Sequence, residues 1–355
     1  MSEYEVAVIA GDGIGPEVTR EALKVLDATG EAFGFRARRS VYPFGTEHYL
    51  ETKEIFPDDA FEEVRGHDAI FLGAIGDPRV PVGLIEYGII ARMRFELDLY
   101  VNLRPIKLYD ASLCPLKDKG PADIDMLIVR ENTEDAYSGA HGFTHKGQPH
   151  EVATQTMVYT RGGVERVIRY AFELARGRVR RQLTLIDKAN AVRAQDLWTR
   201  VFAEVGRDYP DIRTDHAYID AACMWMVKNP EWFDVAVTTN LFGDIITDLG
   251  AMVQGGMGIA ASGNLHPGKV SLFEPIHGSA PKHAGKNVAC PVAAIMAVAM
   301  MLDYLGEKPA AQAIEHAVAD LLRSKRLKGV STGTHPTDEV GDMVVAELRQ
   351  TALAR

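Results

Sequence analysis

The chain has 355 residues, of which 46% are hydrophobic and 25% are charged, a composition typical of an ordinary globular protein. The length is sufficient for two domains with a large core. The formal net charge of −10 argues against nucleic acid as a partner, because phosphate backbones are bound by basic surfaces. A small anionic ligand is still compatible with this charge, since a few clustered arginines can reverse the sign locally.

Five apolar segments have the length and composition of β-strands, namely residues 6–10, 69–75, 126–129, 183–186 and 235–239. Amphipathic segments lie between most of them. In the stretch around TREALKVLDA, for example, the apolar residues Val18, Ala22, Val25 and Leu26 share one helical face. Strands that alternate with helices predict an α/β protein with a largely parallel sheet.

Targeting signals and cysteine pairs are not apparent in the sequence. The N-terminal stretch MSEYEVAVIAG has no basic segment before its apolar run, so we predict no signal peptide. The apolar stretch VAAIMAVAMMLDYLG is interrupted by Asp303 and is too short to span a bilayer comfortably. Cys114, Cys223 and Cys290 are far apart and indicate reduced thiols instead of a disulfide framework or a zinc site. We therefore expect a cytoplasmic protein with no membrane contact.

The segment AGDGIGPEV (10–18) follows the first predicted strand and opens the first predicted helix. Its pattern, G-x-G-x-G-P, differs from the G-x-G-x-x-G of Rossmann units, and the later stretch FRARRSVYPFG lacks the acid that such a unit needs. A tight turn between strand and helix explains the glycines. Amides at the N-terminus of this helix could still approach an anion or a carboxamide.

Three arginines lie in polar segments: Arg94 in RMRFELD, Arg104 in NLRP and Arg130 in IVRENTE. Each can be explained as a solvated surface residue. Their positions near the ends of predicted elements would also allow bidentate binding of carboxylates. If the three converge, we expect them to bind a polyanionic acid.

Polar residues follow or interrupt several apolar segments. Lys188 comes directly after a strand in IDKANA, and Asp220 lies among apolar residues in YIDAACMWM. Asp220 is either a helix N-cap or an acid with a specific partner. Asp244 and Asp248 in TTNLFGDIITDLG are either a first-turn acid with a solvated neighbour or metal ligands. With Asp220 they would supply three hard oxygen ligands, which suit Mg²⁺ or Mn²⁺ and not zinc.

The glycine-rich segment SGAHGFTHKGQPHE (138–151) precedes an alternating segment, VATQTMVYT. The two together predict a projecting β-arm around residues 138–160. The spacing of His141, His145 and His150 would permit metal binding, but no cysteine or carboxylate pair accompanies them. We interpret these histidines as solvent-facing residues.

The motifs GDGIGPEV, LGAIGDP, MRFELDLYVNLRP, VRENTEDAYSG, IDKANA, TTNLFGDIITDLGA and FEPIHGSAPKHAGK resemble, in order and spacing, those of the β-decarboxylating dehydrogenases. That family contains the 3-isopropylmalate, isocitrate, homoisocitrate and tartrate/D-malate dehydrogenases. The resemblance extends over essentially the whole chain, and its motifs are most similar to those of the bacterial 3-isopropylmalate enzymes.

The resemblance implies an α/β, doubly wound, two-domain subunit that is not a Rossmann fold. In this fold the chain leaves the first domain and later returns to it. We expect a cofactor-side domain formed by residues 1–101 and 255–355. Residues 102–254 would form the substrate, metal and dimerisation domain, which includes the β-arm. The resemblance also implies a homodimer whose active sites are shared across the interface.

The resemblance assigns roles to the polar residues described above. Asp244 and Asp248 would ligate Mg²⁺ or Mn²⁺, and Asp220 of the partner subunit would complete that site. Tyr137 and Lys188 would be the catalytic pair, with Lys188 also acting across the dimer. The implied substrate-binding residues are Ile90, Ala91, Arg94, Arg104, Arg130 and Asn190.

The implied reaction is the oxidative decarboxylation of a 3-substituted (2R)-malate. Lys188 would accept the proton of the C2 hydroxyl, and a hydride would pass from C2 to the nicotinamide. The resulting β-keto acid would lose CO₂, and Tyr137 would protonate the enol carbon. A non-catalytic regulatory subunit or a plain metal-binding scaffold would have no chemical need for this complete set of residues.

The resemblance leaves the nucleotide open between NAD and NADP. The implied cofactor-binding residues are Gly13, Ile14, Glu274, His277, Gly278, Ser279, Ala280, Lys282, His283 and Cys290. NAD-dependent members usually carry an aspartate after GSAP, where this chain has Lys282 and His283, a pair similar to the Lys-Tyr of NADP-dependent isocitrate dehydrogenases. Cys290 stands where the family usually has an asparagine.

Substrate choice in the family depends on the short helix before MRFELD, where isopropylmalate enzymes carry consecutive leucines. Here Ile90 keeps an apolar contact, Ala91 opens room, and Arg92 either faces solvent or reaches the 3-substituent. We expect 3-isopropylmalate as the substrate. Tartrate or D-malate, isocitrate or homoisocitrate, and the malate of a specialised pathway are the alternatives.

Overall fold

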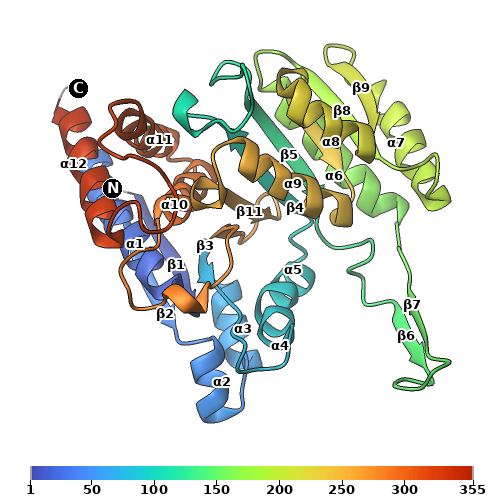
Figure 1. The fold of residues 1–355 in the computed structure, drawn as a ribbon, viewed down its shortest axis with the longest axis horizontal. Helices are drawn as coiled ribbons and strands as arrows, with labels where there is room; N and C mark the ends of the chain where they lie inside the picture. The colour runs from blue at the N-terminus through green and yellow to red at the C-terminus, as the bar shows by residue number, and fades with distance from the viewer. Residues whose placement is uncertain (1, 354–355) are drawn as a thin grey trace. The chain divides into compact units, whose positions relative to one another are not determined.

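A computed structural model describes residues 2–353 of the chain (Figure 1). The described chain divides into two compact units. Unit 1 contains the residues up to Leu99, Lys107–Pro121 and the residues from Ala251 onward, and unit 2 contains Tyr100–Ile106 and Ala122–Gly250. The chain therefore leaves unit 1 and later returns to it.

The bounds of the units differ from the predicted domain bounds. The sequence-based division placed residues 107–121 and 251–254 in the second domain, and both segments lie in unit 1 instead. It placed residues 100–101 in the cofactor-side domain, and these lie in unit 2. Local contacts explain part of the difference. The main-chain amide of Lys107 donates to the side chain of Gln254 at 2.9 Å, and a Cβ at Gly255 would lie 2.8 Å from Cβ of Leu113.

Unit 1 is built on a mainly parallel sheet. Its strands are β1 (Ser2–Gly11), β2 (Phe35–Tyr42), β3 (Ala69–Ala74), β11 (Ala261–Leu265) and β12 (Leu272–Pro275). The strand order is β2-β1-β3-β12-β11. All neighbouring pairs are parallel except β12 and β11, which run antiparallel.

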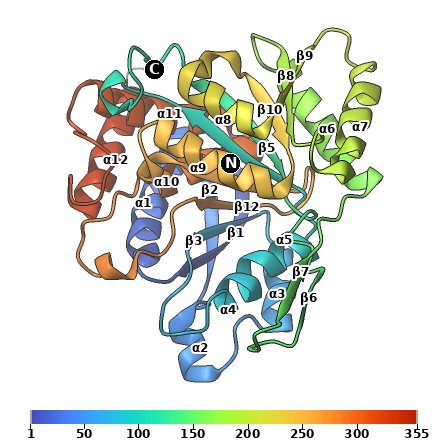
Figure 2. The ribbon, with the colours of Figure 1, turned by 45° about the vertical axis from the view of Figure 1, so that its right-hand side comes forward.

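Helices and turns of unit 1 connect these strands and cover them. They are α1 (Gly15–Phe33), α2 (Thr46–Thr52), α3 (Asp58–Arg65), α4 (Leu84–Glu86), η1 (Tyr87–Ala91), α5 (Arg92–Glu96), η2 (Ala111–Leu113), η5 (Met257–Ile259), η6 (Pro281–His283), α10 (Val292–Tyr304), α11 (Lys308–Arg323) and α12 (Thr337–Leu353). Helix α1 packs against both α10 and α12, and Figures 1 and 2 both show α12 beside α1. Of these elements, η1 is a π-helical turn.

Helix α1 illustrates how the sequence produces an element of unit 1. Its apolar stripe, which includes Val18, Val25 and Leu26, is at most 1% exposed and faces the core. Pro16 stands in the first turn, where a missing amide hydrogen has no cost. Gly34 ends the helix in the left-handed conformation with φ of 80°. The helix predicted from this stripe is confirmed.

Unit 2 contains a second set of strands. They are β4 (Val101–Lys107), β5 (Asp125–Glu131), β8 (Gln182–Asp187), β9 (Arg213–Tyr218) and β10 (Val235–Thr238). Their order is β4-β5-β10-β8-β9. The pairs β5–β10, β10–β8 and β8–β9 are all parallel. The five strands predicted from the sequence correspond to β1, β3, β5, β8 and β10, and the predicted α/β class is confirmed.

The remaining elements of unit 2 are α6 (Arg161–Arg176), η3 (Arg193–Gln195), α7 (Asp196–Gly206), α8 (Ile219–Lys228), η4 (Pro230–Trp232) and α9 (Asn240–Val253). Strands β6 (His141–Thr144) and β7 (Val152–Gln155) pair antiparallel and form an arm that extends beyond α6 and α7 (Figure 1). Figure 2 shows α6 and α7 beside β8 and β9. Within residues 2–353, no helix has both the length and the apolar character needed to cross a membrane.

Candidate active site

The register of unit 2 brings several predicted site residues to one edge of its sheet. Thr238 of β10 lies opposite Arg130 of β5 and Ile186 of β8. Because the three strands are parallel, the segments that follow them all leave the sheet at its carboxyl edge. Ligand sites of parallel α/β sheets are usually found at this edge. The segment after β5 carries Tyr137, and helix α9 starts directly after β10.

Arg130 crosses the first turns of α9. Its side chain is 2% exposed, its Nε donates to Oδ1 of Asn240 at 2.9 Å, and its Nη1 donates to Oδ1 of Asp244. A Cβ at Gly243 would lie 2.5 Å from Cγ of Arg130, so only glycine leaves room for the arginine at this point of the helix. The sequence therefore fixes the contact between β5 and α9 through a buried, hydrogen-bonded guanidinium.

Asp244 is the residue on which these contacts converge. The hydroxyl of Tyr137 donates to its Oδ2 at 2.8 Å, while Arg130 donates to its other oxygen. Arg104 lies further away, with Nη2 at 3.6 Å from Asp244 and Nη1 at 3.6 Å from Asp248. The predicted catalytic tyrosine, two predicted substrate arginines and two predicted metal ligands thus form one group.

Arg104 is held by two polar neighbours besides the aspartates. Its Nη1 donates to Oγ1 of Thr247 at 2.6 Å and its Nε donates to Oδ1 of Asn102 at 2.8 Å. These hydrogen bonds fix the guanidinium beside Asp244 and Asp248. A guanidinium fixed in this way suits the binding of a carboxylate.

The two aspartates of α9 form a like-charge pair beside two arginines. Burial and the charge of Asp244 raise the pKa of Asp248, and Arg104 acts in the opposite direction. Helix α9 begins at Asn240, so Asp244 is in its second turn. The interpretation of Asp244 as a first-turn acid is therefore wrong. The interpretation of Asp248 as merely a solvated neighbour does not account for its position opposite Arg104.

Lys188 and Asp220 form a second pair at the same edge. They follow β8 and β9, in which Asp187 lies opposite Tyr218. Nζ of Lys188 is 2.8 Å from Oδ1 of Asp220, and this ammonium lowers the pKa of the carboxyl group. Asp220 lies within the first turn of α8, whose N-cap is Tyr218. The N-cap interpretation of Asp220 is therefore wrong, and its side chain is exposed and not buried.

The three predicted metal ligands do not gather within a single chain. Among residues 2–353, no group of three or more histidine, cysteine, aspartate or glutamate side chains could hold a metal ion. Asp244 and Asp248 lie one helical turn apart, whereas Asp220 pairs with Lys188.

Arg94 lies in unit 1, where it contacts a residue predicted to bind the cofactor. Its Nη2 is 3.2 Å from Oε1 of Glu274, and its Nε donates to Oδ1 of Asn264 at 2.9 Å. Asn264 in turn donates to Glu274 at 2.8 Å. The side chains of Arg94, Arg104 and Arg130 are 19%, 9% and 2% exposed. The interpretation of these arginines as ordinary surface residues is therefore wrong.

The predicted substrate helix contains a π-helical turn, η1, a feature that is rare and frequent at functional sites. Ile89 is fully buried in the core of unit 1, and Ile90 packs against that core while staying partly accessible. Ala91 is also half-buried. The accessible surface of this turn next to Arg94 is thus apolar at Ile90 and small at Ala91.

The side chain of Arg92 is held by residues of unit 1. Its Nη2 donates to Oδ1 of Asp58 at 2.6 Å and its Nε donates to Oε1 of Glu96 at 2.9 Å. Its guanidinium carbon lies 4.5 Å from the ring centre of Phe61, a cation–π distance. Arg92 is therefore held by neighbouring side chains and is not a free solvent-facing residue, while a contact with the 3-substituent stays a prediction.

The glycine-rich turn and the GSAP segment contact each other in unit 1. Gly13 has a φ of 58°, and a Cβ there would lie 2.0 Å from the carbonyl oxygen of Ser279. The amide of Ile14 donates to the same oxygen at 2.8 Å, and the hydroxyl of Ser279 donates to the carbonyl of Gly76. The glycines therefore serve a tight turn, as expected. The Ile14 amide is committed to Ser279 and is not the exposed donor that the sequence suggested.

His277, within the predicted cofactor segment, has a buried ring nitrogen without a hydrogen-bond partner among the described residues. This nitrogen is Nε2, while Nδ1 lies 3.1 Å from the carbonyl of Gly278. Burial lowers the pKa of His277, so the neutral ring is favoured. A buried donor or acceptor of this kind gains free energy when a ligand satisfies it.

The end of the same segment carries charge on its surface. Ala280 has a φ of 39°, Lys282 is exposed and His283 is half-buried. Cys290 is buried, and burial raises the pKa of its thiol to about 12, so it is a neutral residue. Lys282 is therefore accessible to a ligand from solvent, whereas Cys290 packs in the core.

The arm and the turn after β8 contain the remaining predicted residues. His141, His145 and His150 are exposed, which confirms their interpretation as solvent-facing. Asn190, a predicted substrate residue, is exposed in the turn that follows β8.

Sequence reasoning missed a buried polar group beside the site. Asp135 and Gln195 are 0% exposed, and Tyr159 bonds to both of them. Asp135 lies inside the quoted motif VRENTEDAYSG, but an acid in a polar stretch gives no sign of burial. Tyr159 and Gln195 lie in segments with no recognisable motif.

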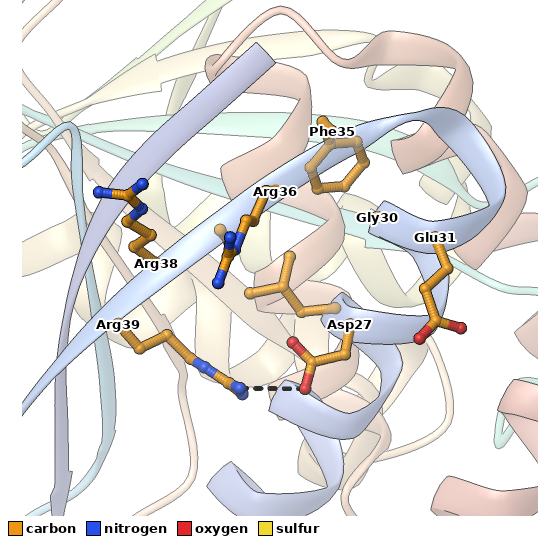
Figure 3. Close-up of a pocket in the computed structure, with 9 residues that line it drawn as sticks. Asp27, Gly30, Glu31, Phe35, Arg36, Arg38 and Arg39 are labelled. Atoms are coloured by element: carbon orange, nitrogen blue, oxygen red, sulfur yellow. Dashed lines mark ion pairs between the residues drawn. The ribbon is translucent and has the colours of Figure 1, made fainter. Parts of the chain in front are cut away.

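A cavity of about 700 Å³ lies in unit 1 beside β2 and the C-terminal part of α1 (Figure 3). It is lined by Leu26, Asp27, Gly30, Glu31, Phe35, Arg36, Ala37, Arg38 and Arg39. Figure 3 shows the ion pair between Arg39 and Asp27, whose charged atoms are 3.1 Å apart. Charges of both signs line this cavity and it contains none of the predicted site residues, so it is not the candidate active site.

Comparison with known proteins identifies the family. A family model described as isocitrate/isopropylmalate dehydrogenase matches residues 5–344. A 3-isopropylmalate dehydrogenase from Thermobifida fusca is 49% identical over 98% of both chains, and one from Frankia casuarinae is 51% identical over 92% of this chain and 94% of the relative. The crystal structure of isocitrate dehydrogenase from Methylococcus capsulatus has a TM-score of 0.88 and 35% identity, covering 98% of this chain and all of that one. The chain therefore belongs to the isocitrate/isopropylmalate dehydrogenase family and is a dehydrogenase of that family.

Proposed function

We propose that the protein catalyses the metal-dependent, NAD(P)-linked oxidative decarboxylation of a 3-substituted (2R)-malate, with 3-isopropylmalate as its substrate. The observation that carries this proposal is the group formed by Tyr137, Arg104, Arg130, Asp244 and Asp248. Relatives about half identical over nearly the whole chain are named 3-isopropylmalate dehydrogenases, which supports the same substrate.

The charges of this group suit a divalent cation together with an anionic substrate. In the structure Asp244 and Asp248 have arginines as their counter-ions. A cation at the aspartates and a carboxylate at the arginines would exchange these internal pairs for ligand pairs without leaving any charge unmatched. The donor set fits Mg²⁺ or Mn²⁺, because it consists of oxygen ligands only. Asp220 of the partner subunit would be the third protein ligand.

The GSAP segment suits a nicotinamide nucleotide. The unpartnered Nε2 of His277 supports a polar ligand at this segment. The exposed ammonium of Lys282 suits a 2′-phosphate, and it cannot accept hydrogen bonds from a ribose diol as an aspartate would. The proposal therefore includes both NAD and NADP, and the preference between them has to be measured.

The protein side chains would bind the substrate and move its protons. Arg104 and Arg130 would bind the malate carboxylates, and Lys188, in its neutral amine form, would take the proton of the C2 hydroxyl as hydride leaves C2. After CO₂ departs from C3, Tyr137 would donate a proton to that carbon, which completes the balance of atoms and charge. When bound, the cation supplies Lewis acidity and the nicotinamide accepts the hydride.

The surface at η1 supports an apolar 3-substituent. Ile90 packs against the core of unit 1 and stays partly accessible, and Arg92, which follows the turn, is held by Asp58 and Glu96. A γ-carboxylate, as in isocitrate, would need a cation that position 92 does not supply. A methylene group in such a pocket contributes about 1–3 kcal/mol, so this turn biases the substrate and does not fix it absolutely.

Exposed apolar residues on α8 and α9 support the homodimer. Met224, Val227 and Ile245 are 66%, 47% and 57% exposed. Exposed large apolar side chains can mark protein interfaces, and a second copy of this chain would cover these three. Sharing of the site is further supported by the absence of a three-ligand group within residues 2–353 of one chain.

A panel of malate analogues, assayed with Mn²⁺ and each nucleotide, tests the proposal. We expect formation of reduced nucleotide and CO₂ in equal amounts, with the highest kcat/KM for 3-isopropylmalate. A higher kcat/KM for isocitrate, tartrate or D-malate would contradict the assignment of 3-isopropylmalate as the substrate. Turnover with no member of the panel would reject the catalytic proposal and favour a regulatory or scaffold role.

A further inference from the structure

Asp135 is a fully buried carboxylate whose two oxygens are both hydrogen-bonded. Oδ2 accepts from the main-chain amide of Leu241 at 2.9 Å, and Oδ1 accepts from the hydroxyl of Tyr159 at 2.8 Å. The amide belongs to the first turn of α9, where the helix dipole favours a negative charge. Asp135 therefore binds the start of the helix that carries Asp244 and Asp248.

The main chain at Asp135 is fixed as well. Its φ is 70°, a left-handed conformation that few side chains adopt, and its amide donates to the carbonyl of Val158 at 2.8 Å. Two residues later the chain reaches Tyr137. The same segment is tied to α9 a second time, because Nδ2 of Asn240 donates to the carbonyl of Glu134 at 3.1 Å.

Gln195 extends this network to Lys188. The side chain is 0% exposed, its Oε1 accepts from the main-chain amide of Lys188 at 2.6 Å, and its Nε2 donates to the hydroxyl oxygen of Tyr159 at 2.8 Å. A main-chain amide can only donate, so the oxygen of the Gln195 side chain has to face Lys188. This fixes the orientation of the whole chain of hydrogen bonds.

Tyr159 is the link between the two ends. Since Gln195 donates to its oxygen, its own hydrogen is available for Asp135. Burial and the charge of Asp135 raise the pKa of Tyr159, so the hydroxyl keeps this hydrogen throughout the physiological range. Its ring packs edge-on against the buried Trp198, with 6.3 Å between the ring centres.

We propose that Asp135, Tyr159 and Gln195 are positioning residues that fix the main chain of Lys188 relative to the first turn of α9. This inference rests on the proposed function, in which Lys188 serves one active site of the dimer while Tyr137, Asp244 and Asp248 of the same chain serve the other. The three residues would then connect the two active sites through one subunit. None of them is placed in contact with substrate or nucleotide.

Replacement of Tyr159 by phenylalanine tests the inference, because it removes the hydroxyl and keeps the ring. We expect Tyr159→Phe to lower kcat about tenfold, the kinetic equivalent of one net hydrogen bond, with KM values for malate and nucleotide changed less than about twofold. Tyr209→Phe is the matched control, because the Tyr209 hydroxyl also donates to a carboxylate of unit 2, that of Glu173, at 2.8 Å. The control should lose less stability, because Glu173 is 58% exposed and water can replace the lost hydroxyl, and it should keep its kcat.

Two further measurements separate positioning from a general loss of structure. Amide hydrogen exchange at Lys188 and Leu241 should accelerate in Tyr159→Phe and not in Tyr209→Phe. The double variant Tyr159→Phe/Gln195→Leu should lose little more kcat than the worse of its two single variants, because both act on one chain of hydrogen bonds.

Equal kcat and equal exchange in the two tyrosine variants would overturn the inference. An additive double variant would also contradict it. If the unmodified enzyme turns over none of the malates, the proposed function fails. The exchange rates at Lys188 and Leu241 would then still decide whether the three residues hold these two segments together.

Discussion

Nζ of Lys188 lies 2.8 Å from Oδ1 of Asp220, and the two residues follow neighbouring parallel strands whose register sets Asp187 opposite Tyr218. The register alone therefore brings them together at the carboxyl edge of the sheet. At the same edge, Tyr137 and Arg130 converge on Asp244. The proposed chemistry uses one of these groups from each subunit of a dimer.

The proposed roles of Lys188 and Asp244 predict large losses of activity. Lys188→Met removes the proton acceptor and Asp244→Asn removes a ligand charge, so each should lower kcat at least about 100-fold. Steady-state kinetics of the purified variants measures this. Lys325→Met, which removes an exposed lysine of unit 1 that pairs with Asp110, is the control and should retain kcat. Near-native turnover of either site variant would refute its assignment.

Arg92 is predicted to matter for stability and not for substrate choice. Arg92→Met would break the contacts with Asp58 and Glu96 and the cation–π contact with Phe61. We expect the free energy of unfolding to fall by about 1 kcal/mol, because these pairs are partly exposed. The ratio of kcat/KM for 3-isopropylmalate over isocitrate should stay within about twofold of its original value. A change of tenfold or more in that ratio would mean that Arg92 reaches the substrate.

Lys282 is predicted to influence the nucleotide preference. Lys282→Asp replaces an exposed cation with an acid that can bind a ribose diol and repel a 2′-phosphate. The ratio of kcat/KM with NAD to kcat/KM with NADP should rise at least about tenfold. Lys286→Asp, which changes an exposed lysine four residues away, is the matched control. An equal change in both variants would indicate a general effect of charge.

His216 is predicted to make part of the stability depend on pH. Its Nε2 lies 3.0 Å from Oδ2 of the buried Asp187, and this hydrogen bond raises the pKa of His216. Because folding raises the pKa of His216, the protonated ring stabilises the folded state. This stabilisation is complete below the unfolded-state pKa of about 6.5, and it is lost as the pH rises through the folded-state pKa. In urea unfolding across this pH range, the free energy of unfolding of His216→Gln should therefore fall furthest below that of the original protein at acidic pH. A deficit that grows towards alkaline pH would contradict the assigned charge state.

Much of the fold could be predicted because its strands and helices are locally encoded. The apolar runs at β1, β3, β5, β8 and β10 are buried on both faces, as parallel strands usually are, and therefore stand out in the sequence. Strand β9, by contrast, has the burial pattern of an exposed edge strand and reads RTDHAY, without an apolar run. Its existence depends on pairing with β8, which is a tertiary effect.

The candidate site could be predicted in its residue types and only partly in its geometry. Motifs indicated Tyr137, Lys188 and the three aspartates, but no pattern in the sequence revealed that Arg92 is held by Asp58, a residue 34 positions earlier in the chain. The buried Asp135 was missed for the same reason, since its partners Tyr159 and Leu241 are distant in sequence. Contacts of this kind arise from packing and cannot be deduced from local spacing.

Complementation between two inactive variants tests the shared site most directly. Homodimers of Tyr137→Phe and of Lys188→Met each have two defective sites, whereas a hybrid dimer has one complete site. Random reassociation of equal amounts makes half of the dimers hybrid, so the account predicts about one quarter of the original activity. Activity no higher than that of the two separate variants, in a mixture shown to contain hybrid dimers, would contradict a site built from two subunits.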